Sequence, residues 1–342
     1  MDSQQTNNSI LDVRHLKKHF PIEKGVLRRV VGQVRAVDDI SFTIRAGETM
    51  GLVGESGCGK TTTARVIMRA MDPTEGSILF RTPGGNAVDM ATVGKRELKA
   101  LRACMQMIFQ DPYSSLNPRM PVIDIVAEPL RAHGWKRKRC EKRVAEVLEL
   151  VGLDPQYMRR YPHAFSGGQR QRIGLARALV LSPSLVVADE PVSALDVSVQ
   201  AQILNLLKEM QDRMSLTYLF ITHDLSVVRY TCDHVAVMYV GKIVEMAETE
   251  ALYANPQHPY TSALLAAVPD VDPHREWLGE TVSGEVADPS QQLVGCPFAP
   301  RCRYAERVCR EVSPPLEDKA EGRGAPHRAA CHRSSEISLA GI

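Results

Sequence analysis

Eight consecutive residues have the types and spacing that bind nucleotide phosphates. Residues 54–61 read Gly-Glu-Ser-Gly-Cys-Gly-Lys-Thr, with two glycines, a lysine and a hydroxyl residue at the required intervals. Glycines let successive backbone N–H groups surround a phosphate, Lys60 can reach the terminal phosphates, and Thr61 can bind Mg²⁺. An apolar run at residues 49–53 precedes the loop and helix-forming sequence follows it. We therefore expect a nucleoside triphosphate site, the alternative being a glycine-rich turn without a ligand.

Two adjacent carboxylates end another apolar run. Residues 185–188 read Leu-Val-Val-Ala and lead into Asp189 and Glu190, so both carboxylates are expected at the carboxyl edge of a buried strand. There Asp189 would hold Mg²⁺ and Glu190 would polarise the attacking water. An acidic pair at a strand end is otherwise typical of a solvated turn. With the phosphate-binding loop, however, the pair indicates a nucleoside triphosphatase.

A third motif carries a resemblance to a known family. Residues 165–169 read Phe-Ser-Gly-Gly-Gln, followed by Arg-Gln-Arg, and they resemble the signature of ABC-transporter ATPases, with Phe165 in place of the commoner Leu. The chain also resembles that family in its order of motifs, from a Gln loop to a D-loop at residues 193–196 and a switch histidine. The resemblance covers residues 10 to about 265. It implies an α/β fold: a RecA-like P-loop ATPase core with an antiparallel β lobe and a helical insertion.

The resemblance also implies a role for each matching residue. The implied catalytic residues are Glu190, His223 and Gln110, and the implied Mg²⁺ ligands are Thr61, Gln110 and Asp189. The implied ATP-binding residues are Phe20, Gly54, Glu55, Ser56, Gly57, Cys58, Gly59, Lys60, Thr61, Thr62, Ser166, Gly167, Gly168, Gln169 and Asp196. Considered alone, a histidine or glutamine is more often structural, and Phe20 has a core position as its alternative to stacking on adenine.

The signature at residues 166–169 predicts a partner. It places N–H donors at an expected helix start, where an anion binds well, but no phosphate-binding loop lies beside it in the sequence. The family works as a head-to-tail dimer in which one subunit's signature closes over the other's ATP. The resemblance therefore implies a heterodimer with a second ATPase subunit, two transmembrane permease subunits and, indirectly, a periplasmic or extracellular substrate-binding protein.

The elements that must position these residues follow from periodicity. Strands are expected at residues 10–13, 40–44, 49–53, 77–80, 185–188 and 218–221, and helices at 61–71, 141–151 and 199–214. Residues 112–181 should form a mainly helical insertion. After residues 255–259 the composition shifts to Pro, Gly, Asp and Cys. We expect a nucleotide-binding domain over residues 1–265 and a Cys-rich extension over residues 266–342.

Four of the eight cysteines lie in that extension, spaced C-x5-C-x6-C-x21-C. Cys296, Cys302, Cys309 and Cys331 resemble the carboxyl-terminal extension of the oligopeptide and dipeptide branch of the family, where four such cysteines are expected to ligate a [4Fe–4S] cluster. Zinc and free thiols are the alternatives. His327 and His332 are possible replacement ligands, or surface histidines.

Composition sets the remaining expectations. The formal net charge is only +2, without a long basic run, so nucleic acid is not an expected partner. The first eight residues lack the features of a secretory signal, and no apolar stretch approaches the roughly 18 residues of a spanning helix. We expect a peripheral protein on the cytoplasmic face of the bacterial inner membrane.

Several functions are compatible with these motifs. Residues 17–21, 36–39 and 191–198 look most like the second ATPase subunit of dipeptide or oligopeptide importers. Nickel, glutathione and opine importers share this ATPase type. The alternatives outside transport are a soluble ABC ATPase that acts on ribosomes or DNA, and a redox sensor or docking module. A single phosphate-binding loop and the absence of a heptad run favour the transport subunit.

Overall fold

The computed structural model describes residues 8–25, 29–111, 115–268, 284, 287–288, 290–291, 294–319 and 325–342. The chain divides into two compact units. Unit 1 comprises Met1–Leu11, Thr43–Glu48 and Leu79–Ile221, and unit 2 comprises Asp12–Phe42, Thr49–Ile78 and Thr222–Ile342. These units do not follow the predicted boundary at residue 265, which stays a prediction.

Long strands near the amino-terminal end build a four-stranded sheet in the order β2-β1-β4-β5. Its strands are β1 (Ser9–Lys24), β2 (Arg29–Arg45), β4 (Glu75–Arg81) and β5 (Ala87–Asp89), and β4 pairs antiparallel with β5. β1 and β2 extend well beyond the predicted strands at 10–13 and 40–44. Most of the extra residues are exposed or only partly buried, so they lack the apolar alternation that reveals a strand in sequence.

Parallel strands form the core of unit 1. β6 (Met105–Ile108) pairs with β7 (Leu185–Asp189), which pairs with β8 (Thr217–Thr222). Every residue of β7 and β8 is buried. This confirms the prediction of buried parallel strands, because a strand covered on both faces needs apolar residues at every position.

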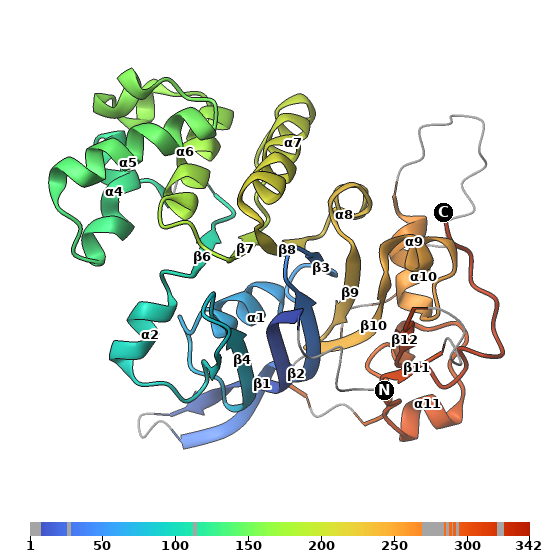
Figure 1. Ribbon diagram of the computed structural model, residues 1–342. Coiled ribbons are helices and arrows are strands. Elements are labelled where there is room, and N and C mark those ends of the chain that lie inside the picture. The colour runs from blue at the N-terminus through green and yellow to red at the C-terminus, as the bar shows by residue number, and fades with distance from the viewer. Residues whose placement is uncertain are drawn as a thin grey trace. The chain divides into compact units, whose positions relative to one another are not determined.

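Helices make up most of the rest of unit 1. α4 (Val122–Ala132), α5 (Arg137–Leu150) and α6 (Gly167–Leu179) pack against one another (Figure 1). The short turns η2 (Pro155–Arg159) and η3 (Pro162–Ala164) follow α5 and precede α6 in the chain. α5 buries Cys140, Val144, Val147 and Leu148 at helical spacing, and it begins before the predicted start at residue 141. Unit 1 also contains α2 (Lys95–Leu101) and α7 (Val197–Met214).

Unit 2 joins strands from distant parts of the chain. β3 (Thr49–Val53) runs parallel to β9 (His234–Tyr239), and β9 pairs antiparallel with β10 (Lys242–Glu248). β10 then pairs with β12 (Arg328–Ala329), and β12 with β11 (Glu317–Asp318). The Cys-rich extension is therefore not a detached tail, because it adds two short strands beside β10.

Short helices complete unit 2. They are α1 (Lys60–Ile67), α8 (Leu225–Thr231), α9 (Thr249–Ala254), α10 (Pro259–Ala266), η4 (Ala299–Arg301) and α11 (Arg307–Glu311). The prediction that the first helix continues to residue 71 was wrong. It ends earlier because Arg69 adopts a left-handed conformation, with φ 51°. Among the described residues, no helix combines the length and apolar character needed to cross a bilayer.

Candidate functional site

The phosphate-binding loop of unit 2 has a backbone that only glycine tolerates at two positions. Gly54 has φ 149°, and a Cβ there would lie 2.1 Å from the carbonyl oxygen of Met238. Gly59 has φ 110°, and its Cβ would lie 2.0 Å from the carbonyl oxygen of Ala36. Gly57, with φ 81°, has open space around it. The loop is therefore held close to neighbouring backbone at both of its ends.

Lys60 sits inside this loop. Its Nζ donates to the carbonyl oxygens of Gly54 at 2.7 Å and Glu55 at 2.9 Å, and the residue is only 5% exposed. Cys58 is buried nearby, and burial raises the pKa of its thiol. The ammonium group is therefore fixed by the curl of the loop, at the place where phosphate oxygens are expected.

Helix α1 begins directly after the loop. Gly59 is its N-cap and offers no side-chain hydrogen bond, and the first turn contains no acidic residue. Its first N–H groups and positive dipole end therefore favour an anion. Thr61 and Thr62 lie half-buried in this first turn, and Ser56 is exposed in the loop.

Glu55 is anchored by residues that the sequence did not associate with the loop. Its N–H donates to the hydroxyl of Tyr260 at 2.9 Å, and its carboxylate accepts two hydrogen bonds from Arg301, at 2.9 and 3.1 Å. Arg301 is 246 residues away in the chain. No local spacing signals such a contact, although both partners lie in segments that carry the family resemblance.

The acidic pair lies at the end of β7 in unit 1. Asp189 is 4% exposed, and Glu190 follows in a left-handed conformation with φ 47°, which costs a non-glycine residue about 1–2 kcal/mol. The Glu190 N–H donates to the carbonyl of Ile221 at 2.8 Å, which offsets part of that cost. Strain of this kind concentrates at functional sites.

Gln110 approaches the same carboxylate. It lies just beyond β6, and its Nε2 donates to Oε2 of Glu190 at 2.9 Å. The predicted Gln loop and the predicted catalytic carboxylate therefore meet. The side-chain amide of Gln171, in α6, donates to the carbonyl oxygen of Pro191 at 2.6 Å. This hydrogen bond connects the signature helix to the segment after Glu190.

The signature forms the start of α6. Ser166 is the N-cap, its hydroxyl accepts from the N–H of Gln169 at 3.3 Å, and Gln169 Oε1 accepts from the N–H of Ser166 at 3.1 Å. This reciprocal capping box fixes the helix start. Gly167 is the first residue of the helix, and a Cβ on Gly168 would lie 2.6 Å from the Val199 side chain. Phe165 is 5% exposed, so the replacement of Leu keeps a buried apolar anchor.

Three further predicted residues have different surroundings. Asp196 caps α7 by accepting from Ser198 and the N–H of Val199, and these hydrogen bonds lower the pKa of its carboxyl group. His223 is exposed between β8 and α8. Phe20 is half-exposed, with the Lys18 ammonium 5.1 Å from the ring centroid, so the core position considered for it is wrong.

The four cysteines of the extension line one small cavity in unit 2, of about 20 Å³. All are free thiols. Burial raises the pKa of Cys302 and Cys331, and raises that of Cys296 to about 11. Within the described residues, no group of three or more His, Cys, Asp or Glu side chains is arranged to hold a metal ion. The predicted metal centre is therefore not supported as a formed site, although its four donors share a cavity.

Both histidines considered as replacement ligands have a polar partner at Nε2, and His332 also lines the cysteine cavity. His327 Nε2 lies 2.7 Å from Oε1 of Glu245, a carboxylate that also accepts from the N–H groups of Gln257 and His258 at 2.7 and 2.9 Å. His332 Nε2 lies 2.9 Å from the carbonyl oxygen of Val312. Since Glu245 is fully buried, its three partners make it a structural junction between β10 and the extension.

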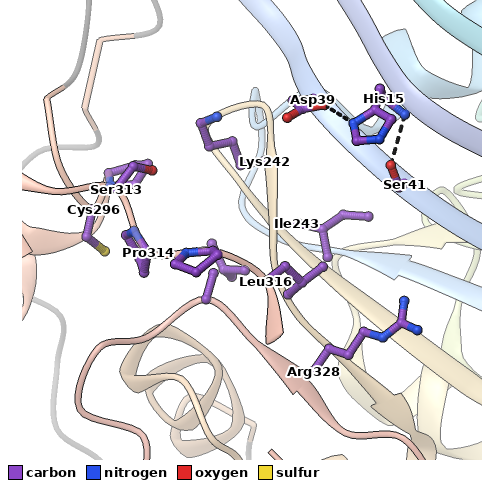
Figure 2. A pocket seen from close by; sticks show the side chains of 14 residues that line it. His15, Asp39, Ser41, Lys242, Ile243, Cys296, Ser313, Pro314, Leu316 and Arg328 are labelled. Atoms are coloured by element: carbon purple, nitrogen blue, oxygen red, sulfur yellow. Dashed lines mark hydrogen bonds and ion pairs between the residues drawn. The ribbon is translucent and has the colours of Figure 1, made fainter. Parts of the chain in front are cut away.

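Figure 2 shows the lining of a second cavity in unit 2, of about 440 Å³. Cys296 and Pro314 line both this cavity and the first. Its wall includes Lys242 and Arg328, and on β1 and β2 a hydrogen-bonded pair in which His15 Nδ1 lies 2.8 Å from Asp39 Oδ1. None of the residues predicted to bind ATP lines it.

The comparisons with known proteins agree with this architecture. Residues 37–193 match the family described as ABC transporter, and residues 244–309 match the family described as the oligopeptide/dipeptide transporter C-terminal region. A solved dimeric ATP-binding cassette, MJ0796, in a post-hydrolysis state bound to ADP and Pi, is similar with a TM-score of 0.60 and 25% identity. That likeness covers 70% of this chain and 98% of the solved one. The α/β fold predicted from the motifs is confirmed, and it defines an ATP-binding cassette ATPase.

Two curated relatives narrow the family. The chain is 49% identical to the oligopeptide transport ATP-binding protein AppF of Bacillus subtilis (strain 168), over 95% of this chain and 97% of AppF. It is also 49% identical to the probable peptide ABC transporter ATP-binding protein y4tS of Sinorhizobium fredii, over 98% of this chain and 93% of y4tS. The chain therefore belongs to the ATP-binding subunits of the oligopeptide and dipeptide branch of ABC transporters, as its motifs predicted.

Proposed function

We propose that this ATPase powers the import of dipeptides or oligopeptides. The observation that carries the proposal is the phosphate-binding loop, in which Lys60 is fixed within 2.9 Å of two loop carbonyls at the start of an uncapped helix. The substrate class rests on the names of AppF and y4tS and on the matched C-terminal region. Nickel, glutathione and opine importers are the alternatives that use the same ATPase type.

The chemistry we propose uses residues from each motif. Lys60 and the α1 N-terminus bind the ATP phosphates, with Glu55, Ser56 and Gly57 in the loop, while Thr61, Gln110 and Asp189 hold Mg²⁺. Glu190 polarises the attacking water, and the Gln110 contact at 2.9 Å keeps its carboxylate oriented. His223 contacts the γ-phosphate and Phe20 stacks on adenine; the half-exposed ring of Phe20 suits that role.

The assembly we propose is a head-to-tail heterodimer. Ser166–Gln169 and Asp196 act on the ATP held by a second ABC ATPase subunit, and two permease subunits and an external substrate-binding protein complete the importer. The exposed Ser166 at the start of α6 supports this, as does the dimeric state of the solved cassette MJ0796. The location that follows is peripheral, on the cytoplasmic face of the cell membrane.

Transport by the reconstituted complex tests the proposal. The chain, its partner ATPase and the two permeases would be placed in vesicles with ATP at the cassette side, and uptake of labelled dipeptides, oligopeptides, nickel and glutathione compared. Peptide uptake that requires ATP and is lost on Lys60→Ala supports the proposal. Uptake of nickel or glutathione alone would indicate one of the alternative importers. Co-purification with ribosomes or DNA in place of permeases would indicate a soluble ABC ATPase.

We also propose that Cys296, Cys302, Cys309 and Cys331 hold a metal centre, a [4Fe–4S] cluster with zinc as the alternative. Four thiols around one cavity are the donor set that either centre requires, and the wide spacing of the cysteines favours the cluster. A cavity of about 20 Å³ holds about one water, so these side chains must move apart to admit a cluster. Iron, sulfide and zinc analysis after anaerobic purification, with Cys302→Ser as the comparison, decides between the two.

A further inference from the structure

We propose that Arg301 is a positioning residue of the phosphate-binding loop, through which the Cys-rich extension sets the affinity of the cassette for ATP. The inference rests on the phosphate-binding role proposed for Lys60. It concerns a contact made entirely within unit 2, between the loop and the η4 turn.

The contact between Arg301 and Glu55 has the geometry that fixes a carboxylate most firmly. Nη1 donates to Oε2 at 2.9 Å and Nη2 donates to Oε1 at 3.1 Å, so both oxygens are engaged by a planar fork. The Arg301 side chain is 7% exposed and that of Glu55 is 28% exposed. Because the pair is largely shielded from water, it is screened less than a surface ion pair.

Arg301 is itself held by an aromatic cluster. Its guanidinium carbon lies 6.0 Å from the ring centroids of both Tyr239 and Phe298. The rings of Tyr239, Tyr260 and Phe298 pack against one another, with centroids 4.6 to 5.4 Å apart. These three side chains are almost completely buried. The cluster therefore gives Arg301 and the Tyr260 hydroxyl a shared, rigid support.

Glu55 connects the aromatic cluster and Arg301 to Lys60. All three of its polar groups are engaged: the N–H by Tyr260, the carboxylate by Arg301, and the carbonyl oxygen by the Lys60 ammonium at 2.9 Å. A shift of the Glu55 backbone would therefore displace Lys60. One residue thus connects the extension to the group that meets the phosphates.

Charge gives Arg301 a second effect on the loop. The loop must accept a triphosphate, and a carboxylate beside it would repel the ligand unless its charge were compensated. The Arg301 guanidinium keeps its positive charge at every physiological pH and contacts both carboxylate oxygens of Glu55, so the compensating cation is permanent. Loss of Arg301 would therefore both loosen the loop and leave a negative charge next to the phosphates.

The experiment compares variants of the full chain in complex with its partner subunits. Arg301→Gln removes the fork and the charge, Arg301→Lys keeps only the charge, and Arg301→Gln with Glu55→Gln removes the carboxylate as well. Arg307→Gln is the matched control, because Arg307 pairs with Glu311 at 2.6 Å in the same extension, with a side chain 89% exposed. ATP binding by calorimetry, the KM and kcat of hydrolysis, the thermal unfolding midpoint and the metal content are measured for each.

We expect Arg301→Gln to weaken ATP binding and raise KM about tenfold, with kcat within about twofold, because the pair acts on ATP binding rather than on the chemical step. The ATP affinity of Arg301→Lys should lie between that of Arg301→Gln and that of wild type. The double variant should recover at least half of the lost ATP affinity on a logarithmic scale. Arg307→Gln should match wild type.

Three results would overturn the inference. One is an Arg301→Gln chain that binds ATP as tightly as Arg307→Gln. Another is a loss of ATP affinity that the added Glu55→Gln change does not relieve. A loss of affinity that comes with a lower unfolding midpoint or with lost metal would also overturn it, because such a loss would result from damage to the extension. A wild-type chain that failed to bind ATP would instead overturn the nucleotide assignment, together with everything that rests on it.

Discussion

Gln110 donates its side-chain amide to the Glu190 carboxylate at 2.9 Å, although 80 residues separate the two in the chain. The contact joins the end of β6 to the residue that follows β7, and Glu190 keeps a left-handed backbone there. A carboxylate held at both its backbone and its side chain cannot turn freely. This geometry supports the role proposed for Glu190, which is to orient the attacking water.

The first prediction concerns Glu190 itself. Glu190→Gln keeps the shape of the side chain but removes the charge that polarises water, so hydrolysis at this site should fall by at least about 100-fold while ATP still binds. Turnover and binding are measured in a complex whose other ATP site is disabled. Asp212→Asn, a change of an exposed carboxylate on α7, is the control. Wild-type turnover in the Glu190 variant would remove the catalytic assignment.

Lys60 gives a complementary result. Lys60→Ala should weaken ATP binding itself by about tenfold or more, because it removes the buried ammonium that is expected to meet the phosphates. Equilibrium binding of MgATP to the full chain measures this. Lys95→Ala, at an exposed position of α2, should bind like wild type. Unchanged affinity in Lys60→Ala would show that this loop does not hold the triphosphate.

The glycines of the loop should differ in their tolerance of alanine. Gly59→Ala places a Cβ 2.0 Å from the Ala36 carbonyl oxygen, so it should lower the free energy of unfolding by more than about 2 kcal/mol and abolish ATP binding. Gly57→Ala meets no atom within 4 Å and carries only the backbone penalty, about 1–2 kcal/mol. Urea unfolding measures both. Equal losses in the two variants would contradict the steric argument.

The buried carboxylate of Glu245 makes the extension sensitive to a single change. Glu245→Ala leaves the N–H groups of Gln257 and His258 without their acceptor, and also frees His327, so we expect a loss of about 3 kcal/mol or more in stability. Glu248→Ala, at an exposed position of the same strand, should cost less than about 0.5 kcal/mol. Chemical unfolding of the two variants side by side provides the comparison. Similar stabilities would mean that Glu245 is not the junction.

His258 predicts how stability depends on pH. Complete burial lowers the pKa of its imidazole to about 3, and the neutral ring accepts the N–H of Tyr260 at 3.1 Å. Between pH 6.5 and 3 the unfolded chain therefore binds a proton that the folded chain does not. Stability should fall as the pH drops below about 6.5, by up to about 1.4 kcal/mol per pH unit from this group.

The measurement is urea unfolding at pH 7.5 and pH 5.0. His258→Asn removes the titrating group and should show a smaller loss between the two pH values than wild type. His163→Asn, at an exposed histidine, should keep the wild-type dependence. If the His258 and His163 variants lose the same stability between pH 7.5 and pH 5.0, buried His258 does not cause the loss in this pH range.

Local sequence patterns predict much of the fold but not its long-range contacts. The apolar run of β7 and the glycine spacing of the loop depend on neighbours in sequence, so both can be recognised from the sequence alone. The contact of Arg301 with Glu55 spans 246 residues and follows no periodicity. Glu245 is equally hidden, because a lone carboxylate in a strand is normally exposed and its partners come from other segments.

The cysteines show a different limit of sequence reasoning. Their spacing predicts that they gather, and all four do line one cavity. Spacing does not determine side-chain directions, however, and among the described residues no set of three or more ligands is arranged around a common point. His327, considered as a replacement ligand or a surface histidine, is buried and contacts Glu245 through its Nε2.

The contact between Glu245 and His327 limits when the sheet of unit 2 can be completed during synthesis of the chain. The ribosome produces Glu245 82 residues before His327. At a synthesis rate of about 5–20 residues per second, roughly 4–16 seconds pass between the synthesis of Glu245 and that of His327. During that interval β10 lacks β12 as a neighbour, since Glu245 pairs with Ala329 in the finished sheet. Unit 2 can therefore complete its sheet only late in synthesis, when the segment that carries His327 has emerged.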